Sequence, residues 1–200
     1  TPDGWWWLIP FGDGSVSVGI VMPSARFKTR TGTVEQLFEA CIESTPEVKA
    51  LLDGFPRLGE IRAIPDYSYT TPRFAGDGFC LVGDAACFLD PVFSTGVLLA
   101  MTSGEMAANA VARALKAKGR VDGPDFREME RYYRGAIRRF SQFVHAFYKP
   151  HMLETFYTPA PNGRIESAVT TILAGGVFTP SLTARLWTVA FHACTVLVWM

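Results

Sequence analysis

The sequence is poor in the residue clusters that mark metal sites, disulfide frameworks and hydrolytic triads. It contains four scattered cysteines, Cys41, Cys80, Cys87 and Cys194, with no CxxC pair. No cysteine and histidine cluster has the spacing of metal ligands, and the three histidines form no arrangement typical of a catalytic triad. These absences argue against a disulfide framework and a metal site, and they favour a reducing cytoplasm.

The sequence also has no excess of charge of either sign. It carries 19 basic and 19 acidic residues, and no block of like charges occurs. Proteins that bind nucleic acid or an acidic membrane surface usually carry a basic excess or a basic patch. We therefore expect neither kind of partner.

No hydrophobic run is long enough for a membrane span. The apolar stretch 188–200 is shorter than the roughly 20 residues that a transmembrane helix needs, so it predicts a packed helix and no integral membrane segment. The polar start at Thr1 does not resemble a signal peptide. Because Thr1 stands where an initiator methionine would, we interpret the chain as a piece of a longer protein.

A dinucleotide-binding glycine motif is missing as well. No GxGxxG opens a βαβ unit, and Gly12, Gly14 and Gly19 have a different spacing. They lie in segment 5–21, whose alternating apolar residues predict a β-hairpin.

The residues that are present predict a substantial core and a clear order of elements. Of the 200 residues, 48% are hydrophobic. Besides the hairpin, alternation predicts strands at 61–70 and 80–82, and helical periodicity predicts long helices at about 96–118 and from 122 onwards. Strands precede helices along the chain, so the fold class is α+β.

Helix signals refine this picture. Thr33 and Gln36 form a capping box, Thr45 precedes a proline at a helix start, and Gly119 follows the first long helix. The second long helix has an apolar stripe with spacings of three and four, made of Phe126, Met129, Tyr133, Ile137, Phe140, Val144 and Phe147. Four arginines lie outside the stripe and are expected on its solvated face: Arg127, Arg131, Arg134 and Arg138. Residues 151–165 are expected to form a loop before a final helical region.

Segment 83–97 carries the chemistry. It reads as the end of a strand, a glycine turn, an acid, a proline-fixed loop and a helix opened by small residues. Gly83 lets the backbone approach a ligand, and Asp84 offers a carboxylate to hydroxyl groups. At a helix start in 94–96, unpaired backbone N–H groups and the macrodipole favour an anion or a developing negative charge.

This segment resembles the second flavin-binding motif of the hydroxybenzoate-hydroxylase-like monooxygenase fold. The resemblance implies that Asp84 binds the ribityl chain of FAD, with Gly83 at the close approach. It also implies that the amides of Gly96 and Val97 face the pyrimidine edge of the flavin ring, and that Pro91 shapes the loop.

A second motif narrows the family. Trp5, Trp7, Ile9 and Pro10 match WxWxIP, and the segment is similar to the signature of flavin-dependent halogenases. The motif lies before the flavin motif, as it does in that family. The two matches together indicate a member of the flavin-dependent halogenases, with the tryptophans shaping a pocket.

The resemblance implies a reaction and its participants. A flavin reductase would supply reduced FAD, and oxygen and chloride or bromide would be consumed to form hypohalous acid, which halogenates an electron-rich ring in natural product biosynthesis. By the same resemblance, Ser94, Thr95 and Gly96 form the halide site. The family's catalytic lysine has no matching position here, so no catalytic residue is assigned.

The resemblance also implies a domain organisation. Residues 1–118 would be a partial FAD and substrate domain, the C-terminal portion of the hydroxybenzoate-hydroxylase-like fold, and 119–200 a helical C-terminal region. The ADP half of FAD and the catalytic lysine would then be bound or supplied by sequence outside this chain.

One departure bears on the substrate. In halogenases of free tryptophan, the motif at this place resembles Glu-Pro-x-Glu-Ser-Thr-Gly. This chain has Asp90 in place of the first glutamate and Phe93 in place of the second. The pattern here is similar to the branch that acts on phenols, on pyrroles or on rings carried by a carrier protein, so we expect one of these substrates.

Two alternatives stay open. A related FAD-dependent monooxygenase or reductase would act without halide. A catalytically silent piece, such as a folded remnant or a carrier-protein docking module, would neither bind FAD tightly nor turn over.

Overall fold

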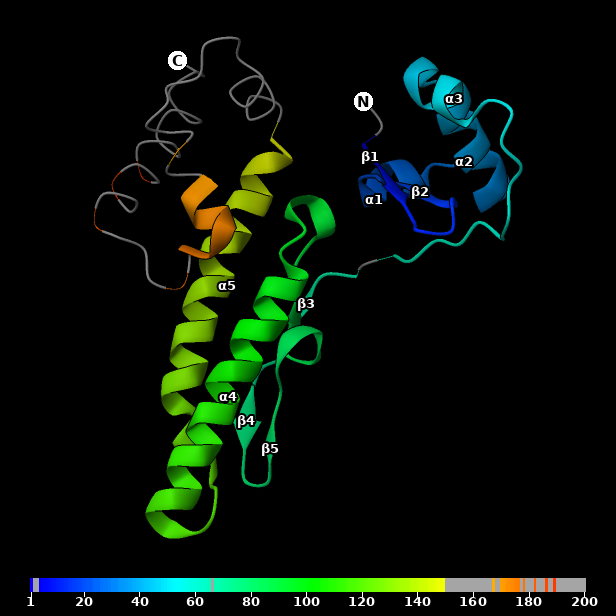
Figure 1. Ribbon diagram of the computed structural model, residues 1–200. Helices are drawn as coiled ribbons and strands as arrows, with labels where there is room; N and C mark the ends of the chain where they lie inside the picture. The colour runs from blue at the N-terminus through cyan, green and yellow to red at the C-terminus, as the bar shows by residue number, and fades with distance from the viewer. Residues whose placement is uncertain are drawn as a thin grey trace. The chain divides into compact units, whose positions relative to one another are not determined.

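The structure of the protein is a computed structural model (Figure 1). It describes residues 1, 4–65 and 67–149, together with 167, 170–176, 178, 182, 186 and 189. The chain divides into two compact units, Thr1–Asp66, here unit 1, and Tyr67–Met200, here unit 2. The boundary that the sequence predicted after residue 118 falls inside unit 2, between its two long helices, and it stays a prediction.

Unit 1 begins with an antiparallel hairpin of β1 (Trp5–Pro10) and β2 (Val16–Val21), which confirms the predicted hairpin. Trp5 and Trp7 alternate onto one face, where their ring centroids lie 6.2 Å apart. Gly19 is the register partner of Trp7, and any side chain at that position would collide with the Trp7 ring. The glycine therefore makes room for the tryptophan of the WxWxIP motif.

Three helices follow in unit 1: α1 (Ser24–Lys28), α2 (Val34–Glu43) and α3 (Pro46–Leu52). The predicted capping box is confirmed at the start of α2. Gln36 donates its amide hydrogen to Thr33 Oγ1 at 3.1 Å, and Thr33 donates its own to Gln36 Oε1 at 2.9 Å.

The start of α3 differs in detail from the prediction. Thr45 stands at the N-cap, but its side chain makes no capping bond. It donates instead to the carbonyl oxygen of Cys41 at 2.9 Å, so it ties α3 to the last turn of α2.

The described part of unit 2 contains four two-residue strands in two antiparallel pairs. β3 (Tyr69–Thr70) pairs with β6 (Cys87–Phe88), and β4 (Ala75–Gly76) pairs with β5 (Phe79–Cys80). The predicted longer strands were wrong in extent.

Of 61–70, only Tyr69 and Thr70 are in a strand, and most side chains of 61–65 are exposed. The predicted 80–82 strand keeps only its first residue. The alternation of apolar and polar residues predicted extended backbone in these segments. Strand pairing within the described part of the chain forms much shorter ladders than that pattern suggested.

The predicted long helices are confirmed as α4 (Gly96–Lys118) and α5 (Arg127–Phe147), which lie side by side in Figure 1. Gly119 ends α4 in the left-handed conformation with φ 69°, as its place after the helix predicted. Before α5, Asp122 and Asp125 form a capping box across the short helical turn Gly123–Phe126.

The apolar stripe of α5 forms the core of unit 2. Phe74 and four of the stripe residues, Met129, Tyr133, Ile137 and Phe140, are buried together. Their neighbours in this core come mainly from α4, from segment 80–93 and from α5 itself. The interior of unit 2 is therefore a two-helix packing with the short strands on its edge.

The arginine prediction was correct for three positions and wrong for Arg134. Arg127, Arg131 and Arg138 are exposed, but Arg134 is half-buried. Its guanidinium lies 3.9 Å from the ring centroid of Phe74 and donates to the carbonyl oxygen of Pro72 at 2.7 Å. An ion pair with Glu130 completes its contacts.

The predicted 151–165 loop, and most of the final helical region, lie outside the described residues. In the part that is described, one π-helical turn occurs at Ile172–Gly176. Within the described residues, no helix has both the length and the apolar character needed to cross a membrane. The same residues contain both strands and helices, so this part of the chain is of mixed α and β structure.

Candidate functional site

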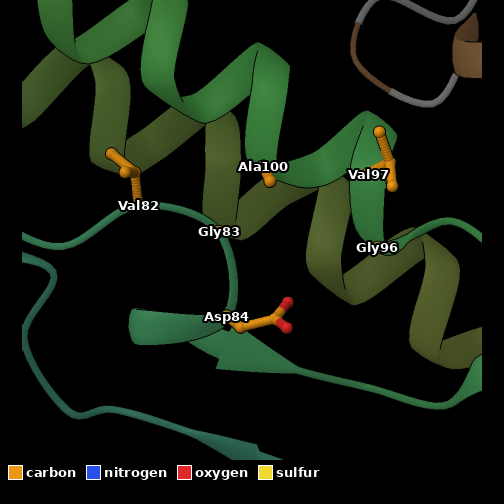
Figure 2. A pocket seen from close by; sticks show the side chains of 6 residues that line it. All are labelled: Val82, Gly83, Asp84, Gly96, Val97 and Ala100. Carbon is orange, nitrogen blue, oxygen red and sulfur yellow. The ribbon is translucent and has the colours of Figure 1, made fainter.

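An open pocket in unit 2 has a volume of about 450 Å³ (Figure 2). Its lining residues come from the turn before β6 and from the first turns of α4: Val82, Gly83, Asp84, Gly96, Val97 and Ala100. Four of the five predicted cofactor residues therefore line one pocket. Pro91, the fifth, is not part of its lining and lies in the loop that leads into α4.

Gly83 is a glycine because of helix α4. It has φ 53°, a left-handed conformation, and a Cβ placed there would lie 2.9 Å from the Cβ of Ala100. Its amide donates to Ser103 Oγ at 2.9 Å, and its carbonyl oxygen accepts a long bond of 3.5 Å from the Tyr133 hydroxyl. The observed close approach is to α4, and an approach to a ligand stays a prediction.

Asp84 follows directly and is exposed at the pocket. Among the described residues, its carboxylate has no hydrogen-bond or ion-pair partner, and only its carbonyl oxygen accepts a bond, from the Tyr69 hydroxyl. Figure 2 shows the carboxylate pointing into the side of the pocket where Gly96 and Val97 lie. The side chain is therefore available to a ligand.

The loop between β6 and α4 is a tightly bonded turn. Asp90 caps the 3₁₀ turn Pro91–Phe93 by accepting the amide hydrogen of Val92 at 2.9 Å. Ser94 follows in the left-handed conformation with φ 52°, and no other described residue apart from glycines has a positive φ. Its amide donates to the Pro91 carbonyl oxygen at 2.9 Å, so the amide of Ser94 is not free for a halide.

At the start of α4, in contrast to this turn, backbone amides lack intrahelical acceptors. Thr95 stands at the N-cap without a side-chain capping bond, and the first bond of the helix runs from the amide of Leu99 to the Thr95 carbonyl oxygen. Helix geometry leaves the amides before Leu99 without intrahelical acceptors. Beside Gly96, a Cβ would meet no described atom within 4 Å. Of the predicted halide residues, Gly96 lines the pocket, whereas Thr95 is buried and is not part of the lining. The amides of both residues lack an intrahelical acceptor.

The electrostatics of the pocket come from backbone rather than basic side chains. Among its lining residues, Asp84 is the one ionisable group. No lysine or arginine lines it, so any attraction for an anion must come from the amides and the dipole of α4. Among the described residues, no group of His, Cys, Asp and Glu side chains could hold a metal ion.

Cys87, next to the motif, has the properties of an unreactive thiol. It is buried, and burial raises the pKa of its thiol, while a contact of 3.2 Å with Thr70 Oγ1 opposes this shift. A raised pKa disfavours the thiolate that a nucleophile needs. Cys87 therefore packs as a small core residue.

The signature residues of the first motif belong to unit 1. Trp5 and Trp7 are half-buried on β1, whereas Ile9 and Pro10 at the end of the strand are exposed. Their part in a pocket stays a prediction.

Sequence reasoning missed the residues that hold the turn and the loop in place. Ser103 lies in the interior of a helix and Tyr133 in an apolar stripe, and neither position carries a signal of a bond to Gly83. Asp90 was noticed only as a substrate marker. Its bonds to Tyr67 and Tyr148, 23 and 58 residues away, depend on tertiary structure.

Comparison with known proteins identifies the family. The family model described as tryptophan halogenase matches residues 1–172. The chain belongs to the tryptophan halogenase family. The resemblance to flavin-dependent halogenases, drawn from WxWxIP and segment 83–97, is thereby confirmed.

Halogenases named for different substrates are similar to this member of the family. Tryptophan 2-halogenase of Chondromyces crocatus is 36% identical over 160 residues, which cover 78% of this chain and 30% of that protein. The 1H-pyrrole-2-carbonyl-(peptidyl-carrier protein) chlorinase of Pseudomonas fluorescens is 28% identical over 174 residues, which cover 87% and 38%.

A solved halogenase structure is also similar to this chain. The flavin-dependent brominase Bmp2 has a TM-score of 0.78 and 25% identity over 95% of this chain and 48% of its own. The chain spans between 30% and 48% of the length of these three proteins.

Proposed function

We propose that the complete protein is a flavin-dependent halogenase of natural product biosynthesis. It would use reduced FAD, oxygen and chloride or bromide to halogenate an electron-rich aromatic ring. The observation that carries the proposal is the pocket of unit 2, which joins an unpartnered carboxylate to an uncapped helix start. Membership of the tryptophan halogenase family supports it.

The size and the lining of the pocket support the proposal that part of an FAD molecule binds there. Its volume of about 450 Å³ falls within the roughly 300–1,000 Å³ of ligand pockets. The Asp84 carboxylate can accept hydrogen bonds from ribityl hydroxyl groups, and the amides of Gly96 and Val97 can donate to carbonyl and nitrogen acceptors of a ring. The open space beside Gly96 is where a Cβ would intrude on such a ring. Gly83, Asp84, Gly96 and Val97 are therefore the proposed FAD contacts, with Pro91 shaping the loop.

The halide would rest at the start of α4. A halide must be held there without strong ligation, because it has to leave as the oxidised species. Backbone N–H groups at a helix N-terminus supply such weak, directed attraction. Thr95 and Gly96 provide these amides, and the contribution of Ser94 is limited to its hydroxyl, because its amide is bonded to Pro91.

The chemistry divides between the cofactor and the protein. Bound and reduced FAD supplies the oxygen-dependent oxidation of the halide. Asp84 holds the cofactor by its hydroxyl groups, the amides of α4 orient the anion, and Gly83 keeps the turn close to α4. No lysine lines this pocket, so the residue that passes the oxidised halogen to the substrate would come from outside the described residues.

The proposed substrate is a phenol, a pyrrole or a ring presented by a carrier protein. Asp90 and Phe93 stand at the two positions where the motif of free-tryptophan halogenases resembles one with glutamate. One similar protein is named for tryptophan and another for a pyrrole on a carrier protein, so these names do not distinguish the substrate classes. The proposed substrate class therefore rests on Asp90 and Phe93.

The remaining parts of the proposal concern what accompanies this chain. A hydroxybenzoate-hydroxylase-like scaffold would be completed by a nucleotide-binding glycine loop and the catalytic lysine elsewhere in the protein. A separate flavin reductase would deliver reduced FAD, and a cytoplasmic location would give access to it.

The test is a product assay with the complete protein. It would receive reduced FAD, oxygen, a simple phenol or pyrrole and either sodium bromide or sodium chloride, and the products would be separated by mass spectrometry. We expect a halogenated ring that depends on the halide.

The control replaces the halide salt with sodium sulfate at equal ionic strength. Hydroxylated product in that control, at the same rate, would assign the protein to the monooxygenases. If the complete protein neither retained FAD nor formed any product, it would be catalytically silent.

A further inference from the structure

Asp90 is the one carboxylate that is buried among the described positions, with 9% of its surface exposed. Its carboxylate accepts three hydrogen bonds from neutral donors. Oδ1 accepts the amide hydrogen of Val92 at 2.9 Å, and Oδ2 accepts from the hydroxyls of Tyr148 at 2.9 Å and Tyr67 at 3.3 Å. Within the described part of the chain, no basic side chain forms an ion pair with it. Burial of a carboxylate is tolerated only when such bonds are made.

The three donors come from three different segments of unit 2. Val92 lies in the turn that Asp90 caps, Tyr67 precedes β3, and Tyr148 follows the last residue of α5. The carboxylate therefore joins the loop before α4 both to the strand pair and to the end of α5.

Aromatic rings surround this junction. Phe93 and Phe147 pack edge to face with centroids 5.7 Å apart, Phe147 contacts Tyr148 at 5.5 Å, and Tyr67 contacts Phe88 at 5.9 Å. Burial, followed by the charge of Asp90, raises the pKa of Tyr67 to about 12, so this hydroxyl keeps its proton at neutral pH. The carboxylate end of these bonds is therefore buried, whereas the Tyr148 side chain that donates one of them is 43% exposed.

This junction fixes an unfavourable backbone conformation. Ser94 is held at φ 52°, ψ 34°, which serine rarely adopts. The chain passes through Ser94 directly into Thr95 and Gly96, whose amides begin α4. A change in the turn at 91–94 would therefore redirect those amides.

We propose that Asp90, held by Tyr67 and Tyr148, is a positioning residue that fixes the amides of Thr95 and Gly96 for the halide. The effect on halide binding rests on the proposed halogenase function. The role of Asp90 in holding the turn does not. Asp90 acts through the turn and not on the reacting atoms.

The test uses Tyr148→Phe in the complete, FAD-loaded protein. The substitution removes one hydroxyl from the carboxylate and leaves the ring. We expect the KM for bromide to rise at least fivefold, with kcat at saturating bromide changed less than twofold and FAD content unchanged. Tyr67→Phe is expected to shift the KM for bromide in the same direction by a smaller factor, because its bond is longer.

Tyr132→Phe is the matched control. Tyr132 lies on α5 with 42% exposure, against 43% for Tyr148, and its recorded contact is with the guanidinium of Arg131. A Tyr148→Phe protein whose KM for bromide equals that of Tyr132→Phe would overturn the proposal. A merely structural defect would instead lower kcat or FAD content together with affinity.

Hydrogen exchange separates this inference from the proposed function. Amides in a peptide covering 91–98 should exchange at least fivefold faster in Tyr148→Phe than in Tyr132→Phe, whether or not the protein halogenates. Equal exchange would refute the positioning role. Faster exchange in a protein that shows no halide dependence would uphold the role of Asp90 in the turn and reject the halogenase proposal.

Discussion

At the scale of single residues, the pocket is built from positions that are close together in the chain. Gly83, Asp84, Gly96 and Val97 come from two short stretches, and the folded chain places all four in one lining. The reason for the glycine was only visible in three dimensions, because it depends on Ala100, 17 residues further along (100 − 83). Residue type was predictable here, and its packing partner was not.

The clearest prediction at this scale concerns Asp84. Asp84→Ala in the complete protein should weaken FAD binding by about 10- to 100-fold, because a charge-assisted hydrogen bond is worth roughly 1.5–3 kcal/mol. Asp84→Asn should lose less, since it keeps an acceptor oxygen. Fluorescence titration with FAD measures both.

Glu105→Ala provides the matched control for this titration. Glu105 is an exposed carboxylate on α4 that does not line the pocket, so its loss should leave FAD affinity unchanged. Equal affinity of Asp84→Ala and Glu105→Ala would show that Asp84 has no part in binding the cofactor.

At the scale of elements, the hairpin of unit 1 and the two long helices were predictable, and the strands of unit 2 were not. The end of α4 follows from Gly119, and α5 follows from an apolar stripe that the chain itself buries. Strand length depends on the partner strand, which local sequence does not specify. The predicted strand at 61–70 therefore shrank to Tyr69–Thr70.

Arg134 shows the same limit on a helix. Its position off the apolar stripe predicted solvent, but Phe74 and Pro72 come to it from another segment. Tertiary contacts of this kind override the helical pattern.

An element-scale prediction concerns the link between α4 and the Gly83 turn. Ser103 is fully buried, accepts the Gly83 amide at 2.9 Å and donates to the Leu99 carbonyl oxygen at 2.7 Å. Ser103→Ala would leave that amide unsatisfied, which costs roughly 1–3 kcal/mol. The better helix propensity of alanine offsets less than about 0.7 kcal/mol, so the free energy of unfolding should fall.

Denaturant unfolding of the complete protein measures this loss, and Ser141→Ala on α5 is the control. Ser141 is half-buried and is not among the contacts of the Gly83 turn, so its substitution should change stability by less than about 0.5 kcal/mol. A Ser103→Ala protein as stable as that control would mean that the bond does not hold the turn.

At the scale of the whole molecule, the sequence predicted more about what is missing than about how the chain divides. The chain spans 30–48% of the length of similar halogenases, and a nucleotide-binding part outside this chain stays a prediction. The boundary at residue 66 was not predicted, because a division into compact units depends on contacts distant in sequence.

The central claim is that the start of α4 holds a halide against FAD. Crystals of the complete protein with FAD and sodium bromide would locate bromine by its anomalous scattering. The account predicts a bromide within hydrogen-bond distance of the Thr95 and Gly96 amides, with the flavin ring beside it and the ribityl chain on Asp84. A flavin bound elsewhere, or bromide absent from those amides while FAD fills the pocket, would contradict it.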